Sequence, residues 1–96
     1  MDEFFAQPAW NVREQLLNLK RQLRDLKLQE RGEQFEFEAK TVVRLSVKEP
    51  HIEVQLVQRP AIQPEWDRFT LGSPPDVRRL LDETKKRVQR WTQGQD

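Results

Sequence analysis

The sequence predicts an α+β fold: a helix, an antiparallel β-hairpin with a possible short third strand, and a second helix, with the helices covering one sheet face. Three observations predict this order. Apolar residues recur with helical spacing after Asn11, the stretch "FEFEAKTVVRLSV" at 35–47 alternates apolar and polar residues, and a second helical stripe of apolar residues follows Ser73. A hairpin that buries one face needs a covering layer, and the two helices supply it.

The first helix is predicted at 11–31. Asn11 and Glu14 have the spacing of a capping box, and Gly32 suits the left-handed residue that ends a helix. Within this segment apolar residues spaced 4, 3, 4 and 3 apart form a narrow seam: Val12, Leu16, Leu19, Leu23 and Leu26. Such a heptad seam suits packing on the chain's own sheet, on a second copy or on another protein.

The alternation at 35–47 resumes at 52–56 after the turn "KEPH". A four-residue loop would pair Val47 with Ile52, Leu45 with Val54, and Val43 with Leu56. Both apolar rows then share one sheet face, which is the strongest indication of the fold. Pro60 would stand opposite Ala39 and cannot donate to a strand ladder, so Phe35 and Phe37 are expected to overhang without cross-strand neighbours.

The remaining elements follow from the second half of the chain. "RFTL", within the proline-rich stretch 59–75, suits a short third strand. Ser73 suits the N-cap of a second helix with Pro74 at its first position. Its apolar stripe is Val77, Leu80, Leu81, Thr84, Val88 and Trp91, and Gly94 ends it. We therefore expect an N-terminal arm at 1–10, a single α+β domain at 11–93 and a disordered tail at 94–96.

The composition and the absence of known motifs argue against several classes of function. The 17 basic and 16 acidic residues nearly cancel, so any electrostatic targeting must be local. The chain has no cysteine, an acidic N-terminus and no apolar stretch of membrane-spanning length, which favours the cytoplasm. His51 is the only histidine, and no residue spacing matches a metal, phosphate or nucleophile motif. We expect no enzyme, no cofactor and no small-molecule substrate.

Basic residues form a second pattern on the first predicted helix. They recur 7, 4, 3 and 4 positions apart along one flank: Arg13, Lys20, Arg24, Lys27 and Arg31. This stripe suits either contact with nucleic-acid phosphates or a solvated flank that shields apolar surface. The cations of the second helix are expected to be structural, through i to i+4 pairs of Asp82 with Lys86 and Glu83 with Arg87.

In outline and length, the order of helix, short antiparallel strands and helix resembles the small dimeric nucleoid-associated proteins of the YbaB type. That family has a glycine-containing turn between its first strands and an Ile-Asp-Pro exit from its sheet. Here the turn is "KEPH" and the exit is "VQRPAIQ". The resemblance implies a nucleic-acid partner only as an alternative, and it assigns no residue a role.

The leading hypothesis is a non-enzymatic protein–protein interaction module, such as an assembly factor, adaptor or accessory subunit, which is expected to be a homodimer. The expected interface combines the helix seam with the two overhanging aromatic residues: Val12, Leu16, Leu19, Leu23, Leu26, Phe35 and Phe37. The alternative is a DNA- or RNA-binding protein that uses the basic stripe Arg13, Lys20, Arg24, Lys27 and Arg31.

Overall fold

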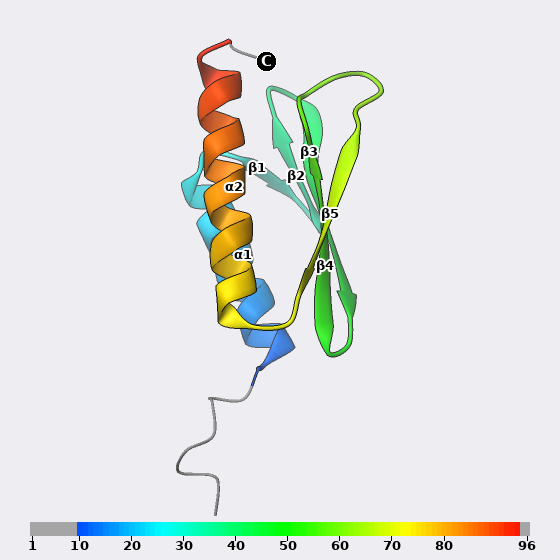
Figure 1. Cartoon of the computed structure of the whole chain (residues 1–96). Coiled ribbons are helices and arrows are strands. Elements are labelled where there is room, and N and C mark those ends of the chain that lie inside the picture. The colour runs from blue at the N-terminus through cyan, green and yellow to red at the C-terminus, as the bar shows by residue number, and fades with distance from the viewer. Residues whose placement is uncertain (1–9, 95–96) are drawn as a thin grey trace, which may run out of the picture.

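The structure, a computed structural model, describes residues 10–94 as a helical layer packed on a five-stranded antiparallel sheet (Figure 1). Both helices, α1 (Val12–Asp25) and α2 (Pro74–Thr92), lie on the same side of the sheet. The strands are β1 (Gln29–Arg31), β2 (Gln34–Phe37), β3 (Lys40–Lys48), β4 (His51–Val57) and β5 (Trp66–Leu71), and they follow chain order across the sheet. The α+β class is confirmed, but the predicted hairpin with one short strand understates the sheet.

The sheet has more strands than predicted because residues 35–47 are not one strand. They contain most of β2, a two-residue turn at Glu38 and Ala39, and most of β3. Both turn residues have positive φ angles, 52° and 69°. A type I′ hairpin turn requires this geometry but normally shows it in sequence as Asn-Gly or Asp-Gly. The Glu-Ala dipeptide carries no such signal.

A β-bulge in β3 explains why the alternation of apolar and polar residues gives no sign of this turn. The two-residue turn shifts the alternation by one position, because the residues that flank it pair and share a sheet face. Phe35 pairs with Val43, but Glu36 pairs with Thr41, so Val42 is an extra residue in β3. This extra residue shifts the alternation back. The two shifts cancel, and the sequence reads as one continuous strand.

The prediction that Phe35 and Phe37 lack cross-strand neighbours is therefore wrong. Phe35 lies opposite Val43 and is fully buried. Phe37 lies opposite Lys40, and its ring packs against the Trp91 ring of α2 with a centroid separation of 5.6 Å. Both aromatic residues belong to the contact between the sheet and the helical layer.

Helix α1 begins as predicted and ends earlier. The Asn11 side chain accepts a hydrogen bond from the Glu14 backbone N–H at 2.9 Å, which confirms the cap. The helix ends at Asp25, and Lys27, with φ 73°, is the left-handed residue that follows it. Gly32, with φ 63°, instead belongs to the two-residue turn between β1 and β2. The pairing of β1 with β2 takes the place of the last predicted helical turns.

The predicted register between the central strands is confirmed. The pairs of β3 with β4 include Val43 with Leu56, Leu45 with Val54, and Val47 with Ile52. The third strand exists as β5 and is longer than "RFTL", since its pairing with β4 runs from Trp66 to Leu71. Within residues 10–94 the sheet is thus a meander whose edge strands are the three-residue β1 and the six-residue β5.

The hydrophobic core fills the space between the sheet and the helices. Leu19 and Leu23 of α1 and Ile52, Val54 and Leu56 of β4 are all 0% exposed. The predicted stripe of α2 faces this core: Val77, Leu80, Thr84, Val88 and Trp91 are buried and Leu81 is partly buried. Neither helix within residues 10–94 has the length and apolar composition needed to cross a membrane.

The predicted arm and tail fall largely outside the described residues. Of the arm at 1–10 the structure describes only Trp10, and of the tail at 94–96 only Gly94. The Trp10 indole N–H donates to the Pro50 carbonyl oxygen at 2.7 Å. This hydrogen bond ties the start of α1 to the turn between β3 and β4.

The turn at Glu38 and Ala39 generates a stability prediction. We expect the double substitution Glu38→Asn and Ala39→Gly to raise the free energy of unfolding by about 1 kcal/mol, because left-handed geometry is costly for most residues with a Cβ and mild for Asn and Gly. Urea denaturation measures the effect. Ala61→Gly, at a loop position without positive φ, is the control and should be neutral or destabilising. Destabilisation by the double substitution would contradict the turn assignment.

Candidate functional site

The residues expected to form a protein interface belong to the chain's own core. Val12, Leu19, Leu23 and Phe35 are buried, and Leu16, Leu26 and Phe37 are partly buried and packed against the core. Of the three packing modes that a heptad seam allows, the structure shows packing within the chain. A partner cannot reach the fully buried members, Leu19, Leu23 and Phe35, while the fold is intact.

The basic stripe expected on the first helix is not a continuous surface. Lys27 and Arg31 lie beyond the end of α1, and Arg31 is part of β1. Within the described residues, three of the five cations pair with carboxylates. The ion pairs are Lys20 Nζ with Glu33 Oε1 at 3.0 Å and Glu30 Oε2 at 3.9 Å, Arg24 Nη1 with Glu30 Oε1 at 2.7 Å, and Arg31 Nε with Glu36 Oε1 at 3.2 Å. Strand β1 and its hairpin thus bring acidic residues to this flank and neutralise most of it.

A group of exposed cations lies instead on α2, on the face opposite its buried stripe. We define the α2 cationic face as Arg78, Lys85, Lys86 and Arg90, which are all exposed and form no ion pair within residues 10–94. The predicted pair of Glu83 with Arg87 is present at 2.7 Å. The predicted pair of Asp82 with Lys86 is absent from the ion pairs formed within residues 10–94. The cations of α2 are therefore only partly structural.

Two further charged residues at the start of α2 hold the helix in place. Asp76 accepts a hydrogen bond from the Gly72 backbone N–H at 2.9 Å and forms an ion pair with Arg79. The Gly72 hydrogen bond is the main cause that lowers the pKa of Asp76 below its usual value. The carboxylate also lies in the first turn of the helix, where a negative charge is favourable.

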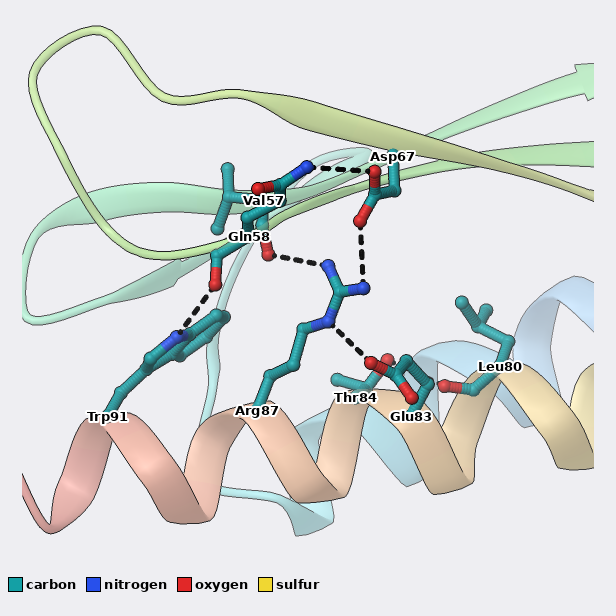
Figure 2. A network of polar contacts seen from close by, with 8 residues as sticks. All are labelled: Val57, Gln58, Asp67, Leu80, Glu83, Thr84, Arg87 and Trp91. Atoms are coloured by element: carbon teal, nitrogen blue, oxygen red, sulfur yellow. Dashed lines mark hydrogen bonds and ion pairs between the residues drawn. The ribbon is translucent and has the colours of Figure 1, made fainter. Parts of the chain in front are cut away.

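Arg87 points from α2 toward the sheet and joins the two layers (Figure 2). Its Nε donates to Glu83 at 2.7 Å, its Nη1 to the Val57 carbonyl oxygen at 3.0 Å, and its Nη2 lies 2.8 Å from Asp67 Oδ2. The side chain is only 12% exposed. One turn along the helix, the Trp91 indole N–H points to the Gln58 carbonyl oxygen at 3.4 Å. These contacts fix the rotation of α2, so its cationic face points away from the sheet.

Asp67 is the acidic partner of this network on β5. Its carboxylate accepts from Arg87 and, at 3.2 Å, from the Gln58 side-chain amide. The hydrogen bond from Arg87 is the largest influence on the pKa of Asp67 and, with the Gln58 amide, lowers it below the ordinary value of 3.8, although burial opposes the shift. Asp67 is therefore ionised when it holds α2 against the sheet at neutral pH.

The outer face of the sheet, which the helices leave uncovered, carries a hollow of about 330 Å³. Side chains from β3, β4 and β5 line it, including Arg44, Lys48, Glu53, Gln55, Arg68 and Thr70. The Arg44 guanidinium carbon lies 4.2 Å from the centre of the Trp66 ring, in cation–π contact. We refer to the hollow and its lining residues as the outer-face hollow.

The outer-face hollow is lined by Arg44, and its stacking partner Trp66 lies on the same sheet face, two residues along β5 from the lining residue Arg68. Trp and Arg are the residues most enriched where interface binding energy concentrates. Stacking on Trp66 holds the Arg44 guanidinium in one place, which reduces the conformational entropy lost on binding. Sequence analysis missed the site because Arg44 and Trp66 are 22 positions apart and meet only when β3, β4 and β5 pair.

Neither a metal site nor a relative identifies the chemistry of this chain. Among residues 10–94, no three His, Asp or Glu side chains come together in an arrangement that could hold a metal ion. Comparisons with models of protein families, with curated proteins and with solved structures find no match.

Removing the Arg87 side chain tests the network in Figure 2. We expect Arg87→Met to lower the free energy of unfolding by about 2 kcal/mol, because it removes the cation that pairs with Asp67 and the donor to the Val57 carbonyl oxygen. The same substitution at exposed Arg90, which lacks an ion pair within residues 10–94, should change it by less than about 0.5 kcal/mol. Equal effects at the two positions in urea denaturation would show that Arg87 does not anchor α2.

The lowered pKa of Asp67 generates a prediction of how the stability of the fold depends on pH. A carboxyl group whose pKa is lowered by folding stabilises the fold above its unfolded pKa, and this stabilisation is lost as the pH falls through the folded pKa. For Asp67 the loss should begin below the ordinary value of 3.8. We expect Asp67→Asn to lower stability at pH 7 and to flatten the loss between about pH 4 and pH 2. Glu65→Gln, at an exposed residue, is the control, and an unchanged pH profile for Asp67→Asn would exclude this role.

Proposed function

We propose that the protein is a non-enzymatic protein–protein interaction module that binds an extended segment of its partner at the outer-face hollow and the edge of β5. It acts as an adaptor or accessory subunit of a larger assembly. The observation that carries this proposal is Arg44, which lines a hollow on the uncovered face of the sheet and is held there by stacking on Trp66.

The unpaired edge of β5 is the second reason to propose a partner segment in extended conformation, because such a segment can pair with this edge as an additional strand. β5 pairs with β4 on one side, and no strand of residues 10–94 pairs with its other side. Proteins usually protect such edges with Pro, charged side chains, a bulge or a very short strand. The β5 sequence "WDRFTL" has no Pro, and of its two charged residues Asp67 is paired with Arg87, whereas the opposite edge strand β1 is only three residues long. An added strand would obtain backbone hydrogen bonds from β5.

The charges of the hollow indicate the composition of the partner segment. Arg44, Lys48 and Arg68 line the hollow together with one carboxylate, Glu53. A segment with acidic side chains on one face would complement this excess of positive charge. Gln55 and Thr70 add neutral hydrogen-bonding groups between the charges. We therefore propose an extended segment that carries Asp or Glu at alternate positions.

The proposal is tested by titrating the ¹⁵N-labelled protein with a ten-residue peptide of alternating Glu and Val, and with a matched peptide of alternating Lys and Val. We expect amide shifts confined to β3, β4 and β5 and at least tenfold tighter binding of the acidic peptide. The double substitution Arg44→Glu and Arg68→Glu should weaken this binding at least tenfold, because each reversal removes an attraction and adds a repulsion.

The matched control is Arg13→Glu with Lys27→Glu, which reverses two exposed cations that form no ion pair within residues 10–94. It should leave acidic-peptide binding within twofold of the wild type. Equal affinity for both peptides, or shifts outside the outer-face hollow and β5, would refute the proposal. A dimer in sedimentation equilibrium that Thr70→Pro dissociates would instead identify the partner as a second copy, the homodimer expected from the sequence.

A further inference from the structure

The exposed face of α2 has a chemistry different from that of the outer-face hollow. The helix contains six basic and three acidic residues. Two of the acids are occupied, since Asp76 pairs with Arg79 and Glu83 pairs with the inward-pointing Arg87. Asp82 is then the only carboxylate of α2 left among the four cations of the α2 cationic face. This face has a local excess of positive charge on a protein whose net charge is +1.

The spacing of these cations suits a linear array of phosphates. Arg78 and Arg90 are twelve positions apart, which is about 18 Å along a helix. One strand of duplex DNA carries about five phosphates over this length. The α2 cationic face therefore presents four cations over a length in which one nucleic-acid strand carries about five phosphates. The Arg87 network and the buried stripe hold the helix rigid beneath them.

The composition of the same face argues against a protein or a membrane as its ligand. From Arg78 onward, every exposed residue of α2 is charged or polar: Arg78, Arg79, Asp82, Lys85, Lys86, Gln89, Arg90 and Thr92. The centre of a protein interface is normally apolar or aromatic, and a membrane-surface helix inserts an apolar face into the lipid. The apolar face of α2 is already buried in the core.

Two neighbouring features extend the surface with hydrogen-bonding groups. Gln89 lies among the cations on the exposed face of α2, and its amide can both donate to and accept from sugar and base edges. Arg78 also borders a groove of about 220 Å³ between the helices, which Gln15, Asn18 and Gln22 of α1 line from the other side. Neutral polar side chains thus flank the charges.

We propose that the α2 cationic face binds the phosphate backbone of nucleic acid. This binding uses a different layer of the molecule from the proposed peptide site and does not depend on it. The contact uses α2 and not the basic stripe predicted from the sequence, because three of the five cations of that stripe form ion pairs within residues 10–94. The interaction is mainly electrostatic and shows little preference for sequence.

The test is fluorescence anisotropy with a labelled 20-base-pair DNA duplex and a labelled 20-nucleotide single-stranded RNA, at 50 and 200 mM salt. Neutralising four phosphates predicts that duplex affinity falls by about 100-fold between these salt concentrations. The triple substitution Arg78→Glu, Lys85→Glu and Lys86→Glu should weaken binding by at least 100-fold at 50 mM salt. Its circular dichroism spectrum should match that of the wild type.

The matched control is Arg13→Glu, Lys27→Glu and Arg59→Glu, which changes the net charge by the same amount at exposed cations away from α2. It should weaken binding less than fivefold. If the α2 charge-reversal variant does not fold, Arg78→Gln, Lys85→Gln and Lys86→Gln replace it. These milder changes should reduce the slope of log affinity against log salt by about 2.7.

Three results would overturn the proposal: no binding of DNA or RNA at tens of micromolar protein, equal weakening by the α2 variant and its control, or equally strong binding of polyglutamate or anionic phospholipid vesicles. The last result would assign the face to acidic proteins or lipids. The variant Arg44→Glu with Arg68→Glu should keep nucleic-acid binding, and the α2 variant should keep acidic-peptide binding. A failure of one proposal is therefore distinguishable from a failure of the other.

Discussion

The contact of Arg87 with the sheet is the constraint on which the arrangement of the surfaces depends. One guanidinium group, only 12% exposed, joins α2 to a backbone carbonyl of β4 and to the Asp67 carboxylate of β5. A charge this enclosed is stable only with its partners in place. The contact therefore fixes the orientation of α2 about its own axis. That orientation buries Val88 and Trp91 and turns Lys85 and Lys86 to solvent.

The shape of the sheet depends on a second local feature, the paired turn and bulge between β2 and β3. The turn adds β1 and β2 to what would otherwise be a three-stranded sheet, and the bulge at Val42 keeps Phe35 on the buried face. The added hairpin also carries Glu30, Glu33 and Glu36, which neutralise cations near α1. A change of strand topology thus decides which helix keeps its positive charge exposed.

The two proposed binding surfaces lie on opposite layers and differ in chemistry. The outer sheet face offers a hollow lined by Arg44, which stacks on Trp66, and arginine and tryptophan are the residues that most often anchor protein interfaces. The exposed face of α2 offers cations and amides with no apolar anchor. A small module with both surfaces is suited to holding a protein partner next to a nucleic acid. Each surface is supported by the core between the layers, so neither has to order itself on binding.

The sequence by itself determined the α+β class, the start of α1, the register of β3 with β4 and the buried stripe of α2. These follow from local capping and from hydrophobic periodicity, which act over a few residues. Only the tertiary structure decided that Glu38 and Ala39 form a turn, because the bulge at Val42 cancels its effect on the alternation. Tertiary contacts also decided which charges stay exposed, since ion pairs such as that of Lys20 with Glu33 join residues of different elements. Sequence spacing shows where a charge lies along the chain, whereas its partner depends on how the strands and helices pack.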